Sequence, residues 1–249
     1  MPTLRITKKQ LEKLSTIVSA YRDITTVPEF GRWKRFDNNE LWTRHVAQII
    51  VVGSSAGADR FYANPKFAQM VNFETLQDLN DSDLVNNVNL ALRNAKVRYA
   101  SSDLKKCMKT KAIVHNFQFI NEQKNALLGI IKMFAKLKGK DCEMERVNYF
   151  IDNLKFMKNK SARDYLMGIG MNRQTLAIDI RIQNIFEHLG VTFPNANELG
   201  SKKVYCEIEN KIINAICRPM EIEPIVFDRI LYQNYKKILA NDFLIPKLF

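Results

Sequence analysis

The stretch KFMKNKSARDYLMGIGMNRQTLAIDIRIQ, residues 155–183, contains two helix starts separated by a loop. Asp164 lies in a first helical turn, apolar residues follow at helical spacing, and Gly170 is suited to end that helix. Asp179 precedes a second apolar run and is suited to cap its start. The stretch therefore sets a lysine, Lys160, at the start of one helix and an aspartate at the start of the next. Helix capping and a solvated charge are the ordinary explanation of such a pair.

Apolar residues recur at helical spacing along most of the chain. In NELWTRHVAQIIVVG, residues 39–53, they lie three and four positions apart, and the run stops at a glycine. The same pattern returns at residues 81–100, 125–139, 144–157, 161–171, 178–191 and 223–240. The clearest loop is residues 191–200, and neither a series of strands nor an internal repeat is present. We therefore predict an all-α chain, a single domain over residues 1–249 made of two packed helical subdomains.

The composition is that of a globular protein with a basic surface. The 249 residues are 46% hydrophobic and 26% charged, and 38 Lys and Arg against 26 Asp and Glu give a net charge of +12. This charge suits an anionic partner, nucleic acid foremost, although a solvated basic face would also explain it. The N-terminus has no apolar core of signal-peptide length, and no run approaches the roughly 18 apolar residues of a membrane span. We therefore expect a soluble, intracellular protein without membrane contact.

The cysteines and histidines do not form a metal-binding pattern. Four cysteines are widely spaced without a CxxC pair, and none of the three histidines is paired at helical spacing. We expect reduced, structural cysteines and no metal site.

Residues 154–181 resemble the helix-hairpin-helix motif of the base-excision DNA glycosylases, most closely the bifunctional 8-oxoguanine DNA glycosylase/AP lyases. That hairpin has the form L-x-G-x-G-x-K-x-A, which Leu154, Lys160 and Ala162 match. The nineteen positions from Lys160 to Asp179 also agree with the family's lysine-to-aspartate spacing. Residues 40–56 resemble the family's early helix with its Ser-rich turn, and 96–99 resemble a further segment in the same order.

The chain departs from the family pattern at three positions. Phe156 and Lys158 stand where the hairpin glycines are expected, and Ala177 stands where a proline often precedes the aspartate. Glycine lets a hairpin backbone approach a phosphate closely. We therefore hypothesise that the side chains of Lys155 and Lys158 supply this grip instead.

The resemblance implies a two-lobed helical array with the active site in the cleft between lobes, the hairpin motif at about residues 147–170 and the catalytic-aspartate helix from 179. The implied enzyme flips an oxidised purine, 8-oxoguanine foremost, out of double-stranded DNA and excises it. Asp179 would stabilise positive charge on the sugar. Lys160, in its neutral form, would form a Schiff base and nick the strand by β-elimination. No cofactor is implied.

Further residues follow from the resemblance, each with an ordinary structural alternative. The predicted DNA-binding residues are Lys155, Lys158, Ser161, Arg181, Ser54 and Ser55. Asp228 and Tyr232, four apart on one helix, are predicted to line the base pocket. The alternatives are a plain turn for the serines, a solvated charge for the arginine and a core position for the tyrosine.

Two other functions stay open: a glycosylase for a different damaged base, and a noncatalytic helical DNA-binding module. The lost hairpin glycines favour the module, and the retained lysine and aspartate favour an enzyme. We expect a monomer located with DNA, in a nucleoid or a nucleus. The lesion, the opposite base and the role of the tail NDFLIPKLF stay undecided.

Overall fold

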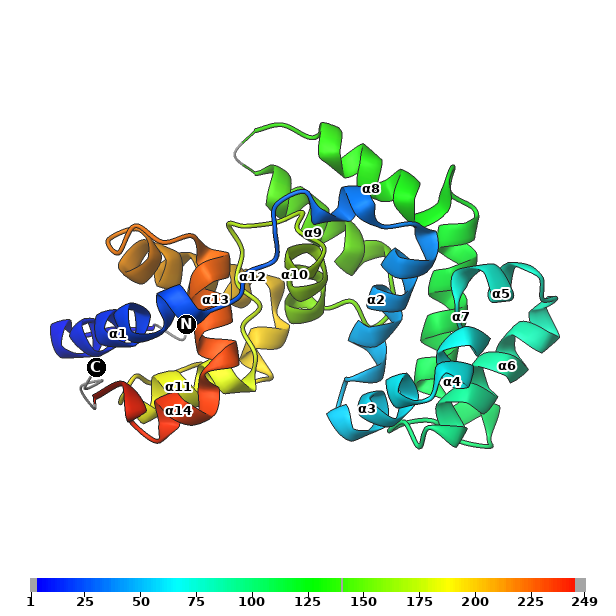
Figure 1. The fold of residues 1–249 in the computed structure, drawn as a ribbon, viewed down its shortest axis with the longest axis horizontal. Coiled ribbons are helices and arrows are strands. Elements are labelled where there is room, and N and C mark those ends of the chain that lie inside the picture. The colour runs from blue at the N-terminus through cyan, green and yellow to red at the C-terminus, as the bar shows by residue number, and fades with distance from the viewer. Residues whose placement is uncertain (1–3, 140, 245–249) are drawn as a thin grey trace. The chain divides into compact units, whose positions relative to one another are not determined.

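The computed structural model describes residues 4–139 and 141–244, and every regular element within them is helical (Figure 1). The all-α prediction is confirmed for this part of the chain. The helices form two compact units. Unit 1 combines both ends of the sequence, Met1–Phe30 and Asn172–Phe249, and unit 2 is the continuous stretch Gly31–Met171.

Unit 2 is organised around helix α2, which has the most helix neighbours in it, namely α3, α5, α7, α8 and α10 (Figure 1). The core of this unit is aromatic: the buried ring of Trp42 makes edge contacts with Phe73 and Phe117. The Trp42 indole N–H also donates to the carbonyl of Val71 over 2.8 Å, so the largest core side chain has its polar atom satisfied. The helices of unit 2 are α2 (Asn38–Ile50), α3 (Ser55–Ala63), α4 (Pro65–Met70), α5 (Phe73–Gln77), α6 (Asp81–Asn94), α7 (Met108–Asn121), α8 (Ala126–Lys136), α9 (Cys142–Asn153) and α10 (Asn159–Gly168), with 3-10 turns at Arg32–Arg35 and Leu104–Lys106.

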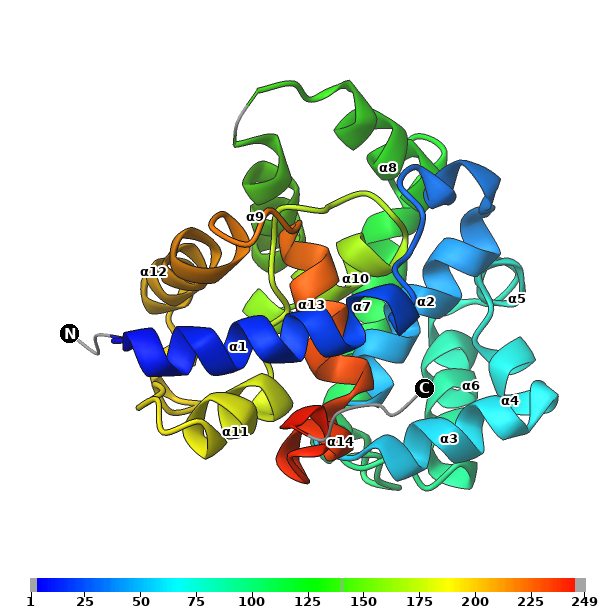
Figure 2. The same ribbon diagram turned by 60° about the vertical axis from the view of Figure 1, so that its left-hand side comes forward.

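Unit 1 packs the first helix of the chain against the last ones, and α1 crosses α13 in Figure 2. Its separate core includes the fully buried rings of Phe186, Tyr205 and Phe227. The helices of unit 1 are α1 (Lys8–Tyr21), α11 (Ile180–His188), α12 (Lys202–Ile212), which continues as a π-helical turn Ile213–Cys217, α13 (Pro224–Gln233) and α14 (Tyr235–Leu239), with 3-10 turns at Arg22–Ile24, Glu198–Gly200 and Asp242–Leu244.

Each of the seven stretches with helical periodicity contains a helix, and local chemistry sets where each one ends. The stretch 144–157 ends its helix at Asn153 and continues as a hairpin, and 223–240 is divided into two helices at Asn234. Gly170 ends α10 with a φ of +73°, as the sequence predicts. The predicted loop 191–200 includes one short 3-10 turn, and residues 245–249 of the tail lie outside the described residues.

In the described residues no helix combines the length and apolarity needed to cross a bilayer.

Candidate active site

The hairpin between α9 and α10 occupies residues 154–158 and is anchored from within unit 2. Leu154 and Met157 are buried in the core. Asn116 of α7 clamps the backbone of Lys155 from both sides: its Oδ1 accepts from the Lys155 N–H at 2.7 Å, and its Nδ2 donates to the Lys155 carbonyl at 2.9 Å. This pair of hydrogen bonds fixes the turn although the glycines of the family pattern are absent.

Phe156 adopts the left-handed backbone conformation that glycine prefers, with a φ of +62°. For a residue with a Cβ this conformation costs about 1–2 kcal/mol, so the surrounding turn must hold it in place. Ser161 contributes: its Oγ accepts from the Lys158 N–H at 2.8 Å and lies 3.1 Å from the Phe156 carbonyl. The structure therefore places Ser161 inside the turn as a brace, while Lys155 and Lys158 are exposed at its surface.

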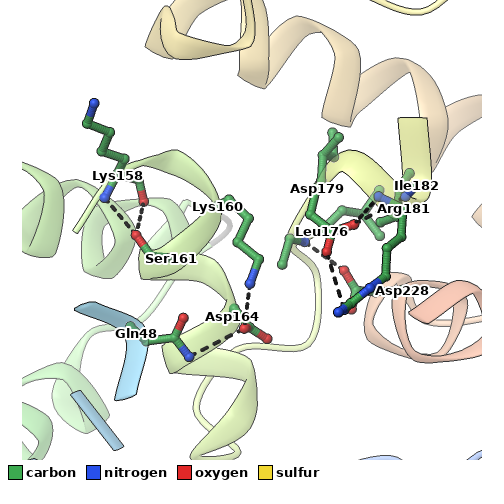
Figure 3. A network of polar contacts seen from close by, with 12 residues as sticks. Gln48, Lys158, Lys160, Ser161, Asp164, Leu176, Asp179, Arg181, Ile182 and Asp228 are labelled. Carbon is green, nitrogen blue, oxygen red and sulfur yellow. Dashed lines mark hydrogen bonds and ion pairs between the residues drawn. The ribbon is translucent and has the colours of Figure 1, made fainter. Parts of the chain in front are cut away.

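Lys160 lies in the first turn of α10 and forms an ion pair one turn along the helix. Its Nζ donates to Asp164 Oδ2 over 2.8 Å, and Gln48 Nε2 from α2 donates to the same oxygen over 3.3 Å (Figure 3). The Lys160 side chain is 33% exposed and that of Asp164 18%. A cavity of about 140 Å³ adjoins this cluster and includes Arg44 and Tyr165 in its lining.

Asp179 is the N-cap of α11, as the sequence predicts. Its Oδ1 accepts from the N–H groups of Arg181 at 2.9 Å and Ile182 at 3.2 Å (Figure 3). The Arg181 guanidinium lies 3.7 Å from Oδ2. A carboxylate held in this way is a group that can stabilise positive charge that develops close to it.

The three residues before Asp179 each donate their backbone N–H to a buried side chain of α12 or α13. Leu176 N donates to Glu209 Oε1 at 2.8 Å, Ala177 N to Asp228 Oδ2 at 2.7 Å, and Ile178 N to Tyr205 Oη at 2.6 Å. Proline, which often stands at the Ala177 position in the resembling family, has no N–H to bond. In this chain the extra donor is matched by Asp228, so the segment before Asp179 is fixed by a hydrogen bond.

Arg181 and Tyr232 come together in unit 1 beside Asp179. The guanidinium carbon lies 4.4 Å from the centre of the Tyr232 ring. Both residues line a pocket of about 450 Å³ together with Gln233, Tyr235, Lys236 and Lys237. Tyr232 is 43% exposed, so the core alternative for it is wrong, whereas Asp228 is 2% exposed and does not line this pocket.

Ser54 and Ser55 are exposed at the turn between α2 and α3, where Ser54 is the N-cap of α3. The turn is held by a residue that the sequence did not indicate. Lys109 of α7 is fully buried, and its Nζ donates to the carbonyls of Ile50 at 2.6 Å and Val52 at 2.8 Å. A cation suits these carbonyls because they end helix α2, where the helix dipole is negative.

Burial, with a smaller contribution from the neighbouring Arg98, lowers the pKa of Lys109 to about 8. Arg98 itself donates to the Gly53 carbonyl over 2.7 Å, so two cations fix this turn. The contacts join positions 45 to 59 residues apart in the sequence, and no local pattern marks them.

The described residues contain no group of three or more His, Cys, Asp or Glu arranged to hold a metal ion. The predicted site residues are divided between the units. Unit 2 carries Ser54, Ser55, Lys155, Lys158, Lys160 and Ser161, and unit 1 carries Asp179, Arg181, Asp228 and Tyr232.

Three solved structures resemble this architecture over most of its length. The 8-oxoguanine DNA glycosylase of Thermotoga maritima matches with a TM-score of 0.63 at 17% identity, over 90% of this chain and 95% of that one. The chain has the fold of the 8-oxoguanine DNA glycosylases.

The 8-oxoguanine DNA glycosylase of Methanocaldococcus jannaschii has the same fold, with a TM-score of 0.59 at 15% identity over 89% of this chain and 91% of that one. The M. jannaschii 8-oxoguanine glycosylase/lyase in complex with a 15mer DNA containing 8-oxoguanine matches with a TM-score of 0.60 at 15% identity, over 92% of this chain and 98% of that one. No family model matches the sequence, and no curated protein matches it. The glycosylase fold is thus retained at low sequence identity.

Proposed function

We propose that the protein is a DNA glycosylase/AP lyase that excises an oxidised purine, 8-oxoguanine foremost, from duplex DNA. One observation carries the proposal: within a glycosylase fold, Lys160 starts the helix after the hairpin and Asp179 is the N-cap of the next helix. Both chemical groups that this reaction needs are therefore present at the two positions where the resembling family carries them.

Binding to DNA is supported by charge. The chain carries a net charge of +12, and Lys155 and Lys158 are exposed at the hairpin. Arg181, Lys236 and Lys237 line the pocket beside Asp179, and Tyr232 offers that pocket an aromatic face. Cations beside an aromatic ring suit a nucleotide, whose phosphate is anionic and whose base can stack.

The chemistry divides between a carboxylate and an amine. Cleavage of the N-glycosidic bond develops positive charge on the sugar, and the ionised Asp179 would stabilise it. The neutral Nζ of Lys160 would bond to C1′ as the base leaves with the electrons of the glycosidic bond and takes up one amine proton. Opening of the C1′–O4′ bond, with transfer of the second amine proton to O4′, would then leave a Schiff base between Nζ and C1′. Loss of a proton from C2′ of the resulting Schiff base then expels the 3′ phosphate, and hydrolysis of the imine would return the free lysine.

Borohydride trapping tests the proposal, because it reduces the Schiff base to a stable protein–DNA adduct. The substrate is a duplex with a single 8-oxoguanine, and the variants are Lys160→Gln and Asp179→Asn. We expect an adduct with the wild-type protein that is lost in Lys160→Gln, and slow excision in Asp179→Asn. The latter variant should still react with a preformed abasic site, since that substrate has no base to remove.

The alternatives give different results in the same assay. An adduct on abasic DNA but none on the 8-oxoguanine duplex would assign the enzyme to another damaged base. DNA binding without any adduct would favour the noncatalytic module, for which the missing hairpin glycines are the supporting observation.

A further inference from the structure

Lys160 is held by a carboxylate that the proposed chemistry does not use. Residues four apart lie on the same face of a helix, and Asp164 meets Lys160 there at 2.8 Å. Exposed pairs of this kind are usually loose. This one is more enclosed, because Asp164 is largely buried and is also bonded by Gln48 from another helix.

The orientation of Gln48 shows that the contact with Asp164 is specific. Only the Nε2 group of its amide can donate to a carboxylate, so the Oε1 atom must point the other way. That Oε1 atom is buried and accepts no hydrogen bond from the described residues. The Gln48 hydrogen bond therefore restrains the Asp164 carboxylate from a second helix, α2.

A carboxylate at this distance favours the ammonium form of lysine, whereas the proposed nucleophile must be neutral. A cation near the amine would act in the opposite direction, and unit 2 has three arginines on the helices around this cluster. Arg44 of α2 lines the same small cavity as Asp164, Arg163 of α10 lies three positions after Lys160, and Arg146 of α9 donates to the Met171 carbonyl near the end of α10. Any effect of these three arginines on the amine is opposed by Asp164, which contacts Nζ at 2.8 Å.

We propose that Asp164 is a positioning residue that aims Lys160 and holds it as an ammonium ion in the resting protein. The amine becomes nucleophilic when the ammonium gives up one proton to water, and Asp164 sets the pH at which this happens. The inference rests on the proposed lyase function of Lys160. It adds a means by which the free protein keeps its amine from reacting with other carbonyl compounds.

The first test reads Lys160 without DNA. Competitive acetylation of the whole protein with acetic anhydride across a pH series, followed by peptide mass spectrometry, gives the pH at which the Lys160 amine becomes reactive. In Asp164→Asn this midpoint should fall by about one to three pH units, the usual effect of an opposite charge at contact distance. Asp164→Glu should retain most of the wild-type behaviour.

The control variant is Asp103→Asn, which removes the carboxylate paired with the exposed Lys106 at 3.7 Å and should leave the Lys160 midpoint unchanged. Equal Lys160 midpoints in wild type and a folded Asp164→Asn would overturn the inference. Circular dichroism shows whether each variant is folded. If Asp164→Asn is unfolded, Gln48→Leu replaces it, and its Lys160 midpoint should fall by a smaller amount. An unchanged midpoint in Gln48→Leu would equally overturn the inference.

The second test is borohydride trapping on duplex DNA with a preformed abasic site, over the same pH series. The yield with Asp164→Asn should reach half its maximum at a lower pH than the wild type, by the same shift as in acetylation. A lower yield at an unchanged midpoint would mean a merely structural role and would overturn the inference. If the acetylation midpoint moves but no duplex gives an adduct, the proposed function fails and the hold of Asp164 on the Lys160 ammonium is supported.

Discussion

Replacing Asp228 by leucine should release the segment that carries Asp179. Asp228 is 2% exposed, and its Oδ2 accepts from the Ala177 N–H at 2.7 Å, two residues before Asp179. Leucine cannot accept this bond, and the Ala177 N–H is left in a buried environment without its partner. Loss of a bond to a charged acceptor, with one buried donor unsatisfied, costs about 2 kcal/mol. Asp228→Asn keeps an acceptor oxygen and should cost less.

Amide hydrogen exchange measures this cost at the atom concerned. A local destabilisation of about 2 kcal/mol corresponds to roughly 30-fold faster exchange of the Ala177 amide in Asp228→Leu. The carboxylate of Asp179 would then be less precisely placed, so the proposed excision of 8-oxoguanine should slow while the proposed reaction with preformed abasic DNA changes less.

A second substitution separates the hydrogen bond from simple packing. Ala177→Pro removes the N–H donor, as in the resembling family. The loss of unfolding free energy caused by Asp228→Leu should therefore be smaller in the Ala177→Pro background than in the wild type, by more than about 1 kcal/mol. Urea unfolding followed by circular dichroism gives both values. Equal costs of Asp228→Leu in the two backgrounds would refute the assignment of this destabilisation to the hydrogen bond between Asp228 and Ala177.

Three further predictions concern the hairpin and its support. Lys155→Ala with Lys158→Ala should weaken duplex binding and reduce the slope of log K against log[salt] by about 0.9 for each phosphate that the variant no longer neutralises, measured by fluorescence anisotropy; unchanged binding at all salt concentrations would exclude a side-chain grip. Phe156→Gly should be more stable than Phe156→Ala by about 1 kcal/mol in urea unfolding, because both variants lose the ring and only alanine keeps the penalty for a positive φ. Burial lowers the pKa of His45 from 6.5 to about 3, so the unfolded chain binds a proton that the folded one does not, and stability falls as the pH drops from 6.5 towards 3. In His45→Gln the free energy of unfolding should fall less steeply as the pH drops from 6.5 towards 3. A fall as steep as in the wild type would mean that another group causes the acid sensitivity.

The sequence predicts the features of the site that depend on neighbours within one helical turn. Asp179 caps α11 and Gly170 ends α10 because capping needs only backbone groups two to five positions away. The turn at Phe156 shows the limit of such reasoning. A missing glycine suggests a changed backbone, yet Phe156 keeps the left-handed backbone conformation that glycine would adopt. Asn116, which is 39 positions from Lys155 in the sequence, holds the turn through its hydrogen bonds.

The residues that sequence analysis misses are those whose partners are distant in the sequence. Lys109 resembles any surface lysine in the sequence, and its burial beneath the turn after α2 depends on packing between α7 and α2. The family resemblance, together with the helix face that Asp228 shares with Tyr232, predicts that Asp228 lines a base pocket. Its bond to the Ala177 N–H, 51 positions away, gives it a structural role that helical periodicity cannot reveal.

The composition of unit 1 from both ends of the sequence has a consequence for synthesis on the ribosome. Helix α1 ends at Tyr21, and α13, against which it packs, begins at Pro224. At a synthesis rate of about 5–20 residues per second, the apolar face of α1, which includes Leu14, Ile17 and Val18, waits roughly 10–40 seconds for that partner. Unit 2 is continuous in sequence and can fold during this interval. During this interval the nascent protein can contain a folded unit 2 preceded by a segment whose apolar side chains still lack their partner, and such exposed apolar surface is what makes a nascent chain prone to aggregation.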